Sequence, residues 1–273
     1  MRSETLNVPG GSLYYEVRGG GPVLLMIPGG PVDADAFAPL ADRLADSFTV
    51  VTCDCRGNSR SRFDGPRAEL TVETFGDDAC RLLDAVGGEP AFVLGSSGGA
   101  TYGLDLVARH PGRVRTLVAH EPPLLMLLPD REGWRAFNQR VRDAYASHGA
   151  FPALQLFGEA MGLNGGPPPE PERREEGEKP EAPAGGVPGN LDLFAGHLIP
   201  TIGAYEPDLD ALKASSTRVV IGLGETSTPD QATFKASWAI AERLGSSPVP
   251  FPGGHGGFSE DVDGFADRLR QLL

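Results

Sequence analysis

The sequence has no long apolar run, few cysteines and a shortage of basic side chains. No stretch approaches the ~20 apolar residues of a membrane-spanning helix, and the opening residues MRSETLNVPGG lack the apolar core of a signal peptide. The three cysteines, Cys53, Cys55 and Cys80, show no Cys-x-x-Cys or Cys/His spacing of a metal site. We therefore expect a cytoplasmic protein with reduced thiols, no membrane contact and no bound metal.

The charge balance is strongly acidic. Aspartate and glutamate number 37 against 24 lysines and arginines, which gives a formal net charge of −13. A protein that binds a polyanion needs a basic face to neutralise phosphates. The balance therefore argues against nucleic acid and anionic membranes as partners. The charge balance does not decide whether the protein forms a homo-oligomer.

Most of the 273 residues alternate between strand-like and helix-like stretches. This alternation is typical of a mostly parallel sheet with helices on both faces. We expect eight strands, at 5–9, 12–17, 22–28, 48–53, 91–95, 114–120, 218–224 and 247–252. We expect helices to accompany them at 34–46, 71–86, 98–109, 230–244 and 260–272.

The alternation breaks once, between residues 122 and 213. This segment predicts only helices, at 131–147, 150–162 and 190–204. Residues 165–188, rich in proline, glutamate and glycine, carry too little apolar surface to offset the entropy of ordering, so we expect a disordered loop there. The chain then divides into a core of 1–121 and 214–273 and a helical insertion of 122–213.

The clearest signal for chemistry is Gly95-Ser96-Ser97-Gly98-Gly99, a G-x-S-x-G sequence between a predicted strand and a predicted helix. A sharp strand-to-helix turn leaves room only for small residues two positions before and after its serine. The turn lifts the Ser97 hydroxyl above the carboxyl ends of the strands, where open α/β sheets bind ligands. Ser97 is therefore the candidate nucleophile.

A serine hydroxyl needs a general base near neutral pH. Of the five histidines we favour His255, which stands in the glycine loop FPGGHGGF between the last predicted strand and the last predicted helix. His120, at a strand end, is the rival base. His110 ends a helix, and His148 and His197 lie in the insertion.

Two glycines are candidates for an oxyanion hole. Gly30 follows the strand at 22–28 in the turn Pro28-Gly29-Gly30-Pro31, and Gly98 directly follows the serine. Glycine lets a backbone N–H approach a developing oxyanion without a side-chain clash.

These pieces together resemble the α/β-hydrolase fold family, in its capped branch with a serine nucleophile. The resemblance covers nearly the whole chain outside 122–213, and it includes DCRGNSRS at 54–61. Two positions depart from the family pattern, because Pro28 stands where histidine is common and Ser59 where glycine is common. The resemblance implies an α/β-hydrolase fold in which the insertion is a cap domain.

The resemblance also implies a triad acid between Ser97 and His255 in the chain. The turn after the strand at 218–224 carries Ser227 where the family most often has aspartate. Glu121 is our preferred acid, because some relatives, including certain haloalkane dehalogenases, carry their acid at this strand end. Glu225, in the usual loop but two residues early, is the alternative. A dyad or a more distant acid such as Asp230 is the third hypothesis.

With serine at the turn, the resemblance implies transfer of an acyl group to water, from a small and largely apolar ester or lactone, without a cofactor. Carbon–carbon bond hydrolases and perhydrolases use the same triad, so the sequence does not distinguish these activities from ester hydrolysis. The alternative is a non-hydrolytic member of the fold with a degraded triad, acting as a ligand binder, cyclase or lyase. The candidate pocket-lining residues are Pro31, Phe137, Tyr145, Phe157, Met161, Phe194 and His197.

Overall fold

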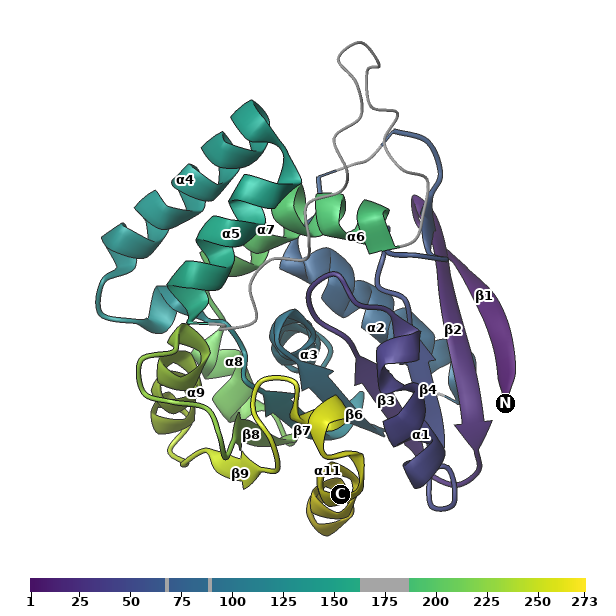
Figure 1. Ribbon diagram of the computed structural model, residues 1–273. Coiled ribbons are helices and arrows are strands. Elements are labelled where there is room, and N and C mark those ends of the chain that lie inside the picture. Colours follow the sequence, from purple (N-terminus) through teal and green to yellow (C-terminus); the bar gives the residue numbers. More distant parts are fainter. Residues whose placement is uncertain (67–68, 88–89, 163–186) are drawn as a thin grey trace.

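A twisted sheet runs through the centre of the molecule (Figure 1). The computed structural model describes residues 1–66, 69–87, 90–162 and 187–273. Within these ranges the sheet has nine strands in the order β1-β2-β4-β3-β6-β7-β8-β9, with β5 paired to β2. The strands are Arg2–Val8 (β1), Gly11–Gly19 (β2), Val23–Ile27 (β3), Thr49–Cys53 (β4), Arg62–Phe63 (β5), Ala91–Ser96 (β6), Val114–His120 (β7), Arg218–Gly224 (β8) and Val249–Phe251 (β9).

The sheet is mostly parallel, as the sequence predicts. Strands β1 and β2 form an antiparallel hairpin, β2 runs antiparallel to β4, and every pairing from β4 to β9 along the sheet is parallel. The expected number of eight strands was one too few. The missed strand, Arg62–Phe63, has two residues, too short to show any alternation, and it exists because it pairs with Gly11 and Ser12 of β2.

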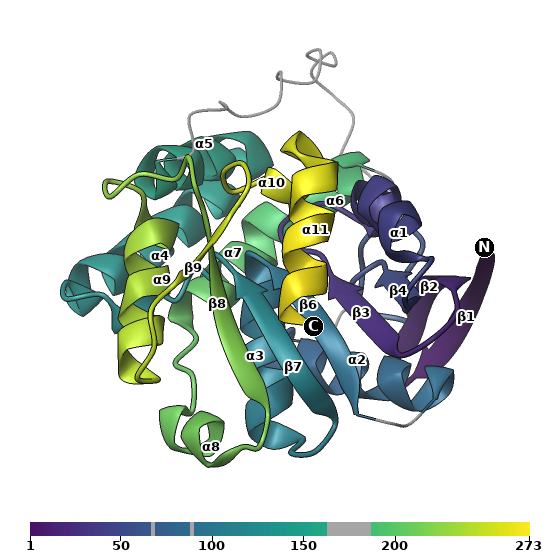
Figure 2. The ribbon, with the colours of Figure 1, turned by 90° about the horizontal axis from the view of Figure 1, so that it is seen from below.

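Helices cover both faces of the sheet (Figure 2). Alternate side chains of the buried strands reach opposite faces, as in β3, where Leu24 and Met26 join one core and Leu25 and Ile27 the other. The first core lies under α1 and α11, and the second under α2, α3 and α9. The bounds are Ala38–Leu44 (α1, after the 3₁₀ turn η1 at Ala34–Phe37), Val72–Val86 (α2), Gly98–Arg109 (α3), Ala232–Arg243 (α9), Gly257–Glu260 (α10) and Val262–Leu272 (α11).

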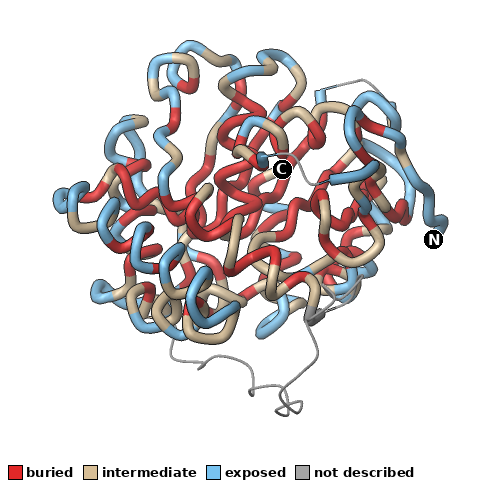
Figure 3. Tube along the Cα trace, turned by 90° about the horizontal axis from the view of Figure 1, so that it is seen from above, coloured by how far each residue is buried: buried red, intermediate tan, exposed pale blue. Residues whose placement is uncertain are grey.

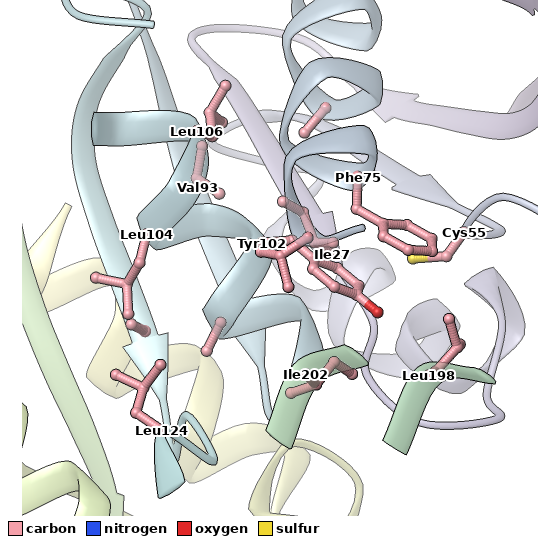
Figure 4. Packing of buried hydrophobic residues seen from close by; sticks show 14 of the residues in the cluster. Ile27, Cys55, Phe75, Val93, Tyr102, Leu104, Leu106, Leu124, Leu198 and Ile202 are labelled. Carbon is pink, nitrogen blue, oxygen red and sulfur yellow. The ribbon is translucent and has the colours of Figure 1, made fainter. Parts of the chain in front are cut away.

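Burial is concentrated along the central strands, and exposed residues lie around the rim (Figure 3). In the larger core the rings of Phe75 and Tyr102 stack with centroids 4.3 Å apart. Leu198 and Ile202, from the helical segment, pack on the same cluster (Figure 4). The helical segment and the core therefore share one continuous apolar interior.

The part of 122–213 that the structure describes contains helices and turns only, gathered mainly beside the carboxyl ends of the strands (Figure 1). The helix expected at 190–204 begins earlier, at Val187, and contains one π turn. The predicted disordered loop at 165–188 lies outside the described residues except for 187 and 188, which open that helix. The elements are Leu125–Leu127 (η2), Arg131–His148 (α4), Ala150–Met161 (α5), Val187–Leu193 (α6), Phe194–Leu198 (η3, the π turn), Ile199–Ala204 (α7) and Leu209–Ala214 (α8). Within the described ranges no helix combines the length and apolar character that crossing a bilayer requires.

Candidate active site

Ser97 stands on a strained turn between β6 and α3. Its backbone has φ 54° and ψ −121°, a conformation that L-residues rarely adopt. A Cβ atom on Gly95 would lie 2.4 Å from the carbonyl oxygen of Gly99, and one on Gly99 would lie 2.0 Å from that of Ile27. Only glycine fits at both positions, which is the physical reason for the glycines on either side of the serine. The Ser97 N–H donates to the His120 carbonyl at 2.9 Å, which ties the turn to the neighbouring strand.

His255 and Glu121 meet at the same edge of the sheet. Glu121 directly follows β7, has φ 49° and is fully buried, while His255 lies in the loop after β9. The Glu121 Oε2 atom lies 2.7 Å from His255 Nδ1, although the two residues are 134 positions apart in the chain. Because β6, β7 and β9 are parallel, their carboxyl ends bring the serine turn, Glu121 and the His255 loop to one edge.

The Glu121 carboxylate has three further hydrogen-bond donors. Its Oε1 accepts from the Gly224 N–H at 3.0 Å and from the Ser227 hydroxyl, and its Oε2 also accepts from the Thr233 hydroxyl at 3.2 Å. Burial by itself raises the pKa of this carboxyl, but the hydrogen bond and charge of His255 and the Ser227 hydroxyl outweigh it and lower the pKa to about 2. Glu121 is therefore an anion at neutral pH, and it holds the proton of His255 on Nδ1, leaving Nε2 as the basic nitrogen.

The other carboxylates considered from the sequence lie elsewhere. Glu225 is exposed, and its backbone N–H donates to the Phe251 carbonyl at 2.8 Å. Asp230 is exposed and accepts from the Thr228 hydroxyl. Among the described residues, Glu121 is the acid that hydrogen bonds to His255.

His120, the rival base, points into the core. Its ring is fully buried between Phe251 and Phe265, with centroids 5.6 Å and 5.3 Å away. Within the described residues neither ring nitrogen has a hydrogen-bond partner. Burial lowers the pKa of His120 from 6.5 to about 4, so the ring is neutral over the range in which a general base works.

The buried neutral ring gives the stability of the protein a pH dependence. The pKa of His120 is about 4 in the folded chain and 6.5 in the unfolded chain, so the unfolded state gains the proton first as the pH falls. The stability that depends on the neutral His120 ring is fully present above pH 6.5 and is lost as the pH falls from 6.5 to 4. We expect the free energy of unfolding to fall by about 2 kcal/mol from pH 7 to pH 5 through this residue. In His120→Leu this part of the loss should disappear in urea titrations at the two pH values. An equal loss in wild type and variant contradicts the assignment.

Gly30 and Gly98 bring two backbone N–H groups together. A Cβ atom on Gly98 would lie 3.8 Å from the Gly30 nitrogen, and one on Gly29 would lie 2.6 Å from the Gly98 nitrogen. Gly30 has φ +61°, in the left-handed region that favours glycine. In the described part of the chain neither N–H is paired with an acceptor. Two adjacent free donors at a helix N-terminus can stabilise a developing negative charge.

A cavity that is partly open to solvent lies at Ser97. Apart from the serine its lining is apolar, and Phe157 and Phe194 are the two predicted lining residues that reach it. The sequence missed part of the lining, because apolar periodicity does not tell which helix face meets a cavity and which meets another helix. Within the described ranges the lining consists of Ser97, Gly98, Pro123, Leu125, Phe157, Phe194, Ile199, Ile202 and Gly203.

The other predicted lining residues pack within the helical segment or beside it. Phe137 is buried against Trp134, and Met161 is buried at the end of α5. The Tyr145 hydroxyl donates to Asp192 at 3.0 Å, and its ring faces His197. The Pro31 carbonyl accepts a hydrogen bond from α6. None of these five is part of the cavity lining in the described structure.

Comparison with known proteins gives matches over the whole chain. The family model described as alpha/beta hydrolase fold matches residues 22–163. The "Uncharacterized hydrolase YraK" of Bacillus subtilis is 37% identical over 277 residues, which cover 100% of this chain and 96% of that protein. A zearalenone hydrolase of Bionectria ochroleuca is 32% identical over 127 residues, 45% of this chain and 48% of that protein.

Solved structures resemble the whole molecule at lower identity. A thermophilic esterase from Thermogutta terrifontis has a TM-score of 0.74 at 18% identity, covering 100% of this chain and 98% of that one. The enol-lactonase from Burkholderia xenovorans has a TM-score of 0.66 at 18% identity, covering 99% of both chains. At this level of identity the likeness shows that the fold is shared, and it carries no information about the substrate.

Proposed function

The chain belongs to the α/β-hydrolase fold family and is a hydrolase of that family, and from this premise we propose that it is a serine hydrolase with Ser97, His255 and Glu121 as its triad. One observation carries the proposal. A buried, ionised carboxylate lies 2.7 Å from Nδ1 of a histidine, at the sheet edge where a strained turn presents a serine. A histidine oriented by a carboxylate, on the sheet edge that carries the serine, is the kind of base that a weakly nucleophilic hydroxyl needs for activation.

Each group has a defined role in the proposed reaction. Ser97 Oγ attacks the substrate carbonyl while His255 Nε2 takes its proton, and the Gly30 and Gly98 N–H groups stabilise the oxyanion. His255 then protonates the leaving alcohol, and Ser97 holds the acyl group as an ester. A water molecule, deprotonated by His255, then attacks the acyl carbon; His255 returns the proton to Ser97 Oγ as that oxygen leaves, and the carboxylic acid is released. Glu121 keeps the imidazole in the correct tautomer and stabilises its charged form.

The cavity supports a small, largely apolar ester or lactone as substrate. Apart from Ser97, none of the described side chains in its lining is charged or hydrogen bonding. A charged acyl group would lose its hydration there without gaining a partner. Four of the lining side chains come from η2, α5 and α7, so we propose that the helical segment acts as a cap over the site: Leu125, Phe157, Ile199 and Ile202.

A fluorophosphonate probe tests the nucleophile directly. The probe phosphonylates an activated serine and adds a fixed mass, so we expect one adduct, on the peptide that contains Ser97. The adduct should be absent from Ser97→Ala. Ser96→Ala is the matched control, since it removes the neighbouring buried hydroxyl, and it should still be labelled. Wild-type protein that is folded but stays unlabelled would contradict the proposal of a serine hydrolase and favour a non-hydrolytic binder or template.

A further inference from the structure

A buried amide side chain connects α6 to two loops of the core. Asn190 lies in α6 and is 1% exposed. Its Oδ1 accepts from the Ser59 N–H at 2.7 Å, and its Nδ2 donates to the Pro31 carbonyl at 2.9 Å and to the Ser59 hydroxyl at 2.8 Å. One side chain thus makes three hydrogen bonds to loops that lie 131 and 159 residues away in the chain.

One of those loops carries Gly30. Asn58 Nδ2 lies 3.4 Å from the Gly30 carbonyl and 3.2 Å from the Val32 carbonyl, so amide side chains hold three consecutive carbonyls, at residues 30, 31 and 32. Peptide groups are planar and the proline ring fixes φ at Pro31, so few torsions remain free in this turn. On the other side, Gly29 is packed against the serine turn, where a Cβ atom would lie 2.4 Å from the Ser96 carbonyl oxygen. The orientation of the Gly30 N–H is therefore set from both ends.

The second loop carries Ser59, whose side chain takes part in the same network. Ser59 has φ +44°, a strained conformation for a residue with a side chain. Its hydroxyl donates to Asp33 Oδ2 at 2.6 Å and accepts from Asn190. The hydroxyl thus links Asn190 to the loop that follows Pro31, a link that glycine cannot make.

The same stretch of helix also reaches the cavity. Phe194 follows Asn190 by four residues, which places both side chains on one face. The Phe194 ring lines the cavity and lies 3.8 Å from where a Cβ atom of Gly30 would be. The face of this helix that lines the cavity is therefore also the face that holds the turn at 30–32.

We propose that Asn190 is a positioning residue for acyl transfer, which seats the helical segment on the turn at 30–32 and thereby fixes the Gly30 N–H for the oxyanion. This inference rests on the proposed function. It assigns a catalytic consequence to a residue that contacts neither the triad nor the cavity. It also predicts that loss of the Asn190 hydrogen bonds weakens binding of the transition state and leaves binding of the substrate nearly unchanged.

The test compares Asn190→Leu with wild type on p-nitrophenyl butyrate. We expect kcat to fall about 10–100-fold, below the ~10²–10³-fold loss of a complete oxyanion donor, while KM changes less than threefold. Binding of an alkyl trifluoromethyl ketone, which forms a tetrahedral adduct with Ser97, should weaken by the same factor as kcat. Binding of the matching alcohol, which forms no adduct, should stay unchanged.

Two further variants separate positioning from stability. Asn190→Asp keeps an acceptor for the Ser59 N–H and loses the donor to Pro31, so it should lie between wild type and Asn190→Leu; it also serves if the leucine variant does not fold. Asp192→Ala, on the same helix, removes a contact within the helical segment and should leave ketone binding unchanged. A lower Tm with unchanged kcat and ketone affinity, or a change in KM alone, overturns the role of Asn190. Wild-type protein that forms no ketone adduct overturns the proposed function and this inference with it.

Discussion

Replacing Ser97 with alanine, His255 with alanine, or both should give three variants with the same residual esterase activity, about 10⁴–10⁶-fold below wild type in kcat. The nucleophile and its base act as one unit, because an unassisted hydroxyl is a weak nucleophile and a base without the hydroxyl has nothing to activate. The double variant should therefore be no worse than either single variant. The measurement is hydrolysis of p-nitrophenyl butyrate at pH 8.

The three variants should fold like wild type. Ser97 is half-buried, its side chain makes no hydrogen bond within the described residues, and His255 is part-exposed in a loop. His110→Gln is the matched control, since His110 pairs with Asp77 away from the site, and it should keep full activity. Losses that multiply in the double variant would show two independent contributions and contradict a shared proton transfer.

The parts of the fold that depend on local pattern could be predicted from the sequence. Apolar runs such as Val23–Ile27 are buried on both sides and are typical of parallel strands, and Gly95 marks a sharp turn, because a Cβ atom there would clash with Gly99. The position of His255 follows in the same way from its glycine loop. These features need only neighbouring residues for their explanation.

The features that the sequence left open depend on contacts between distant segments. Nothing local separates Glu121 from Glu225 as an acid, since the choice is made by four donors from distant parts of the chain: β8, the loop after it, α9 and the loop after β9. The short strand β5 exists only through its pairing with β2. Asn190 looks like an ordinary polar residue at a helix start, and its importance is visible only once Pro31 and Ser59 lie against it.

Replacing Glu121 with glutamine should lower kcat about 10³–10⁴-fold with little change in KM. The Gly224 N–H can only donate, so it holds the amide oxygen of the new side chain in the place of Oε1. The NH₂ group then faces His255 Nδ1, which must become an acceptor. The imidazole proton moves to Nε2, where the ring can no longer take a proton from Ser97. Glu225→Gln, at the other carboxylate considered, is the control and should keep wild-type kcat.

A carboxylate at position 227, where the resemblance to the family implies the triad acid, should restore activity to a protein that lacks Glu121. The Ser227 hydroxyl hydrogen bonds to the Glu121 carboxylate, so a carboxylate at 227 enters the same buried pocket once residue 121 is shortened. We expect Glu121→Ala to be as impaired as the glutamine variant, and Glu121→Ala combined with Ser227→Asp to recover at least tenfold in kcat. Ser227→Asp alone should lose stability, because two buried carboxylates then repel each other. A folded double variant without recovery would mean that the geometry of Glu121, and not the charge beside His255, limits the reaction.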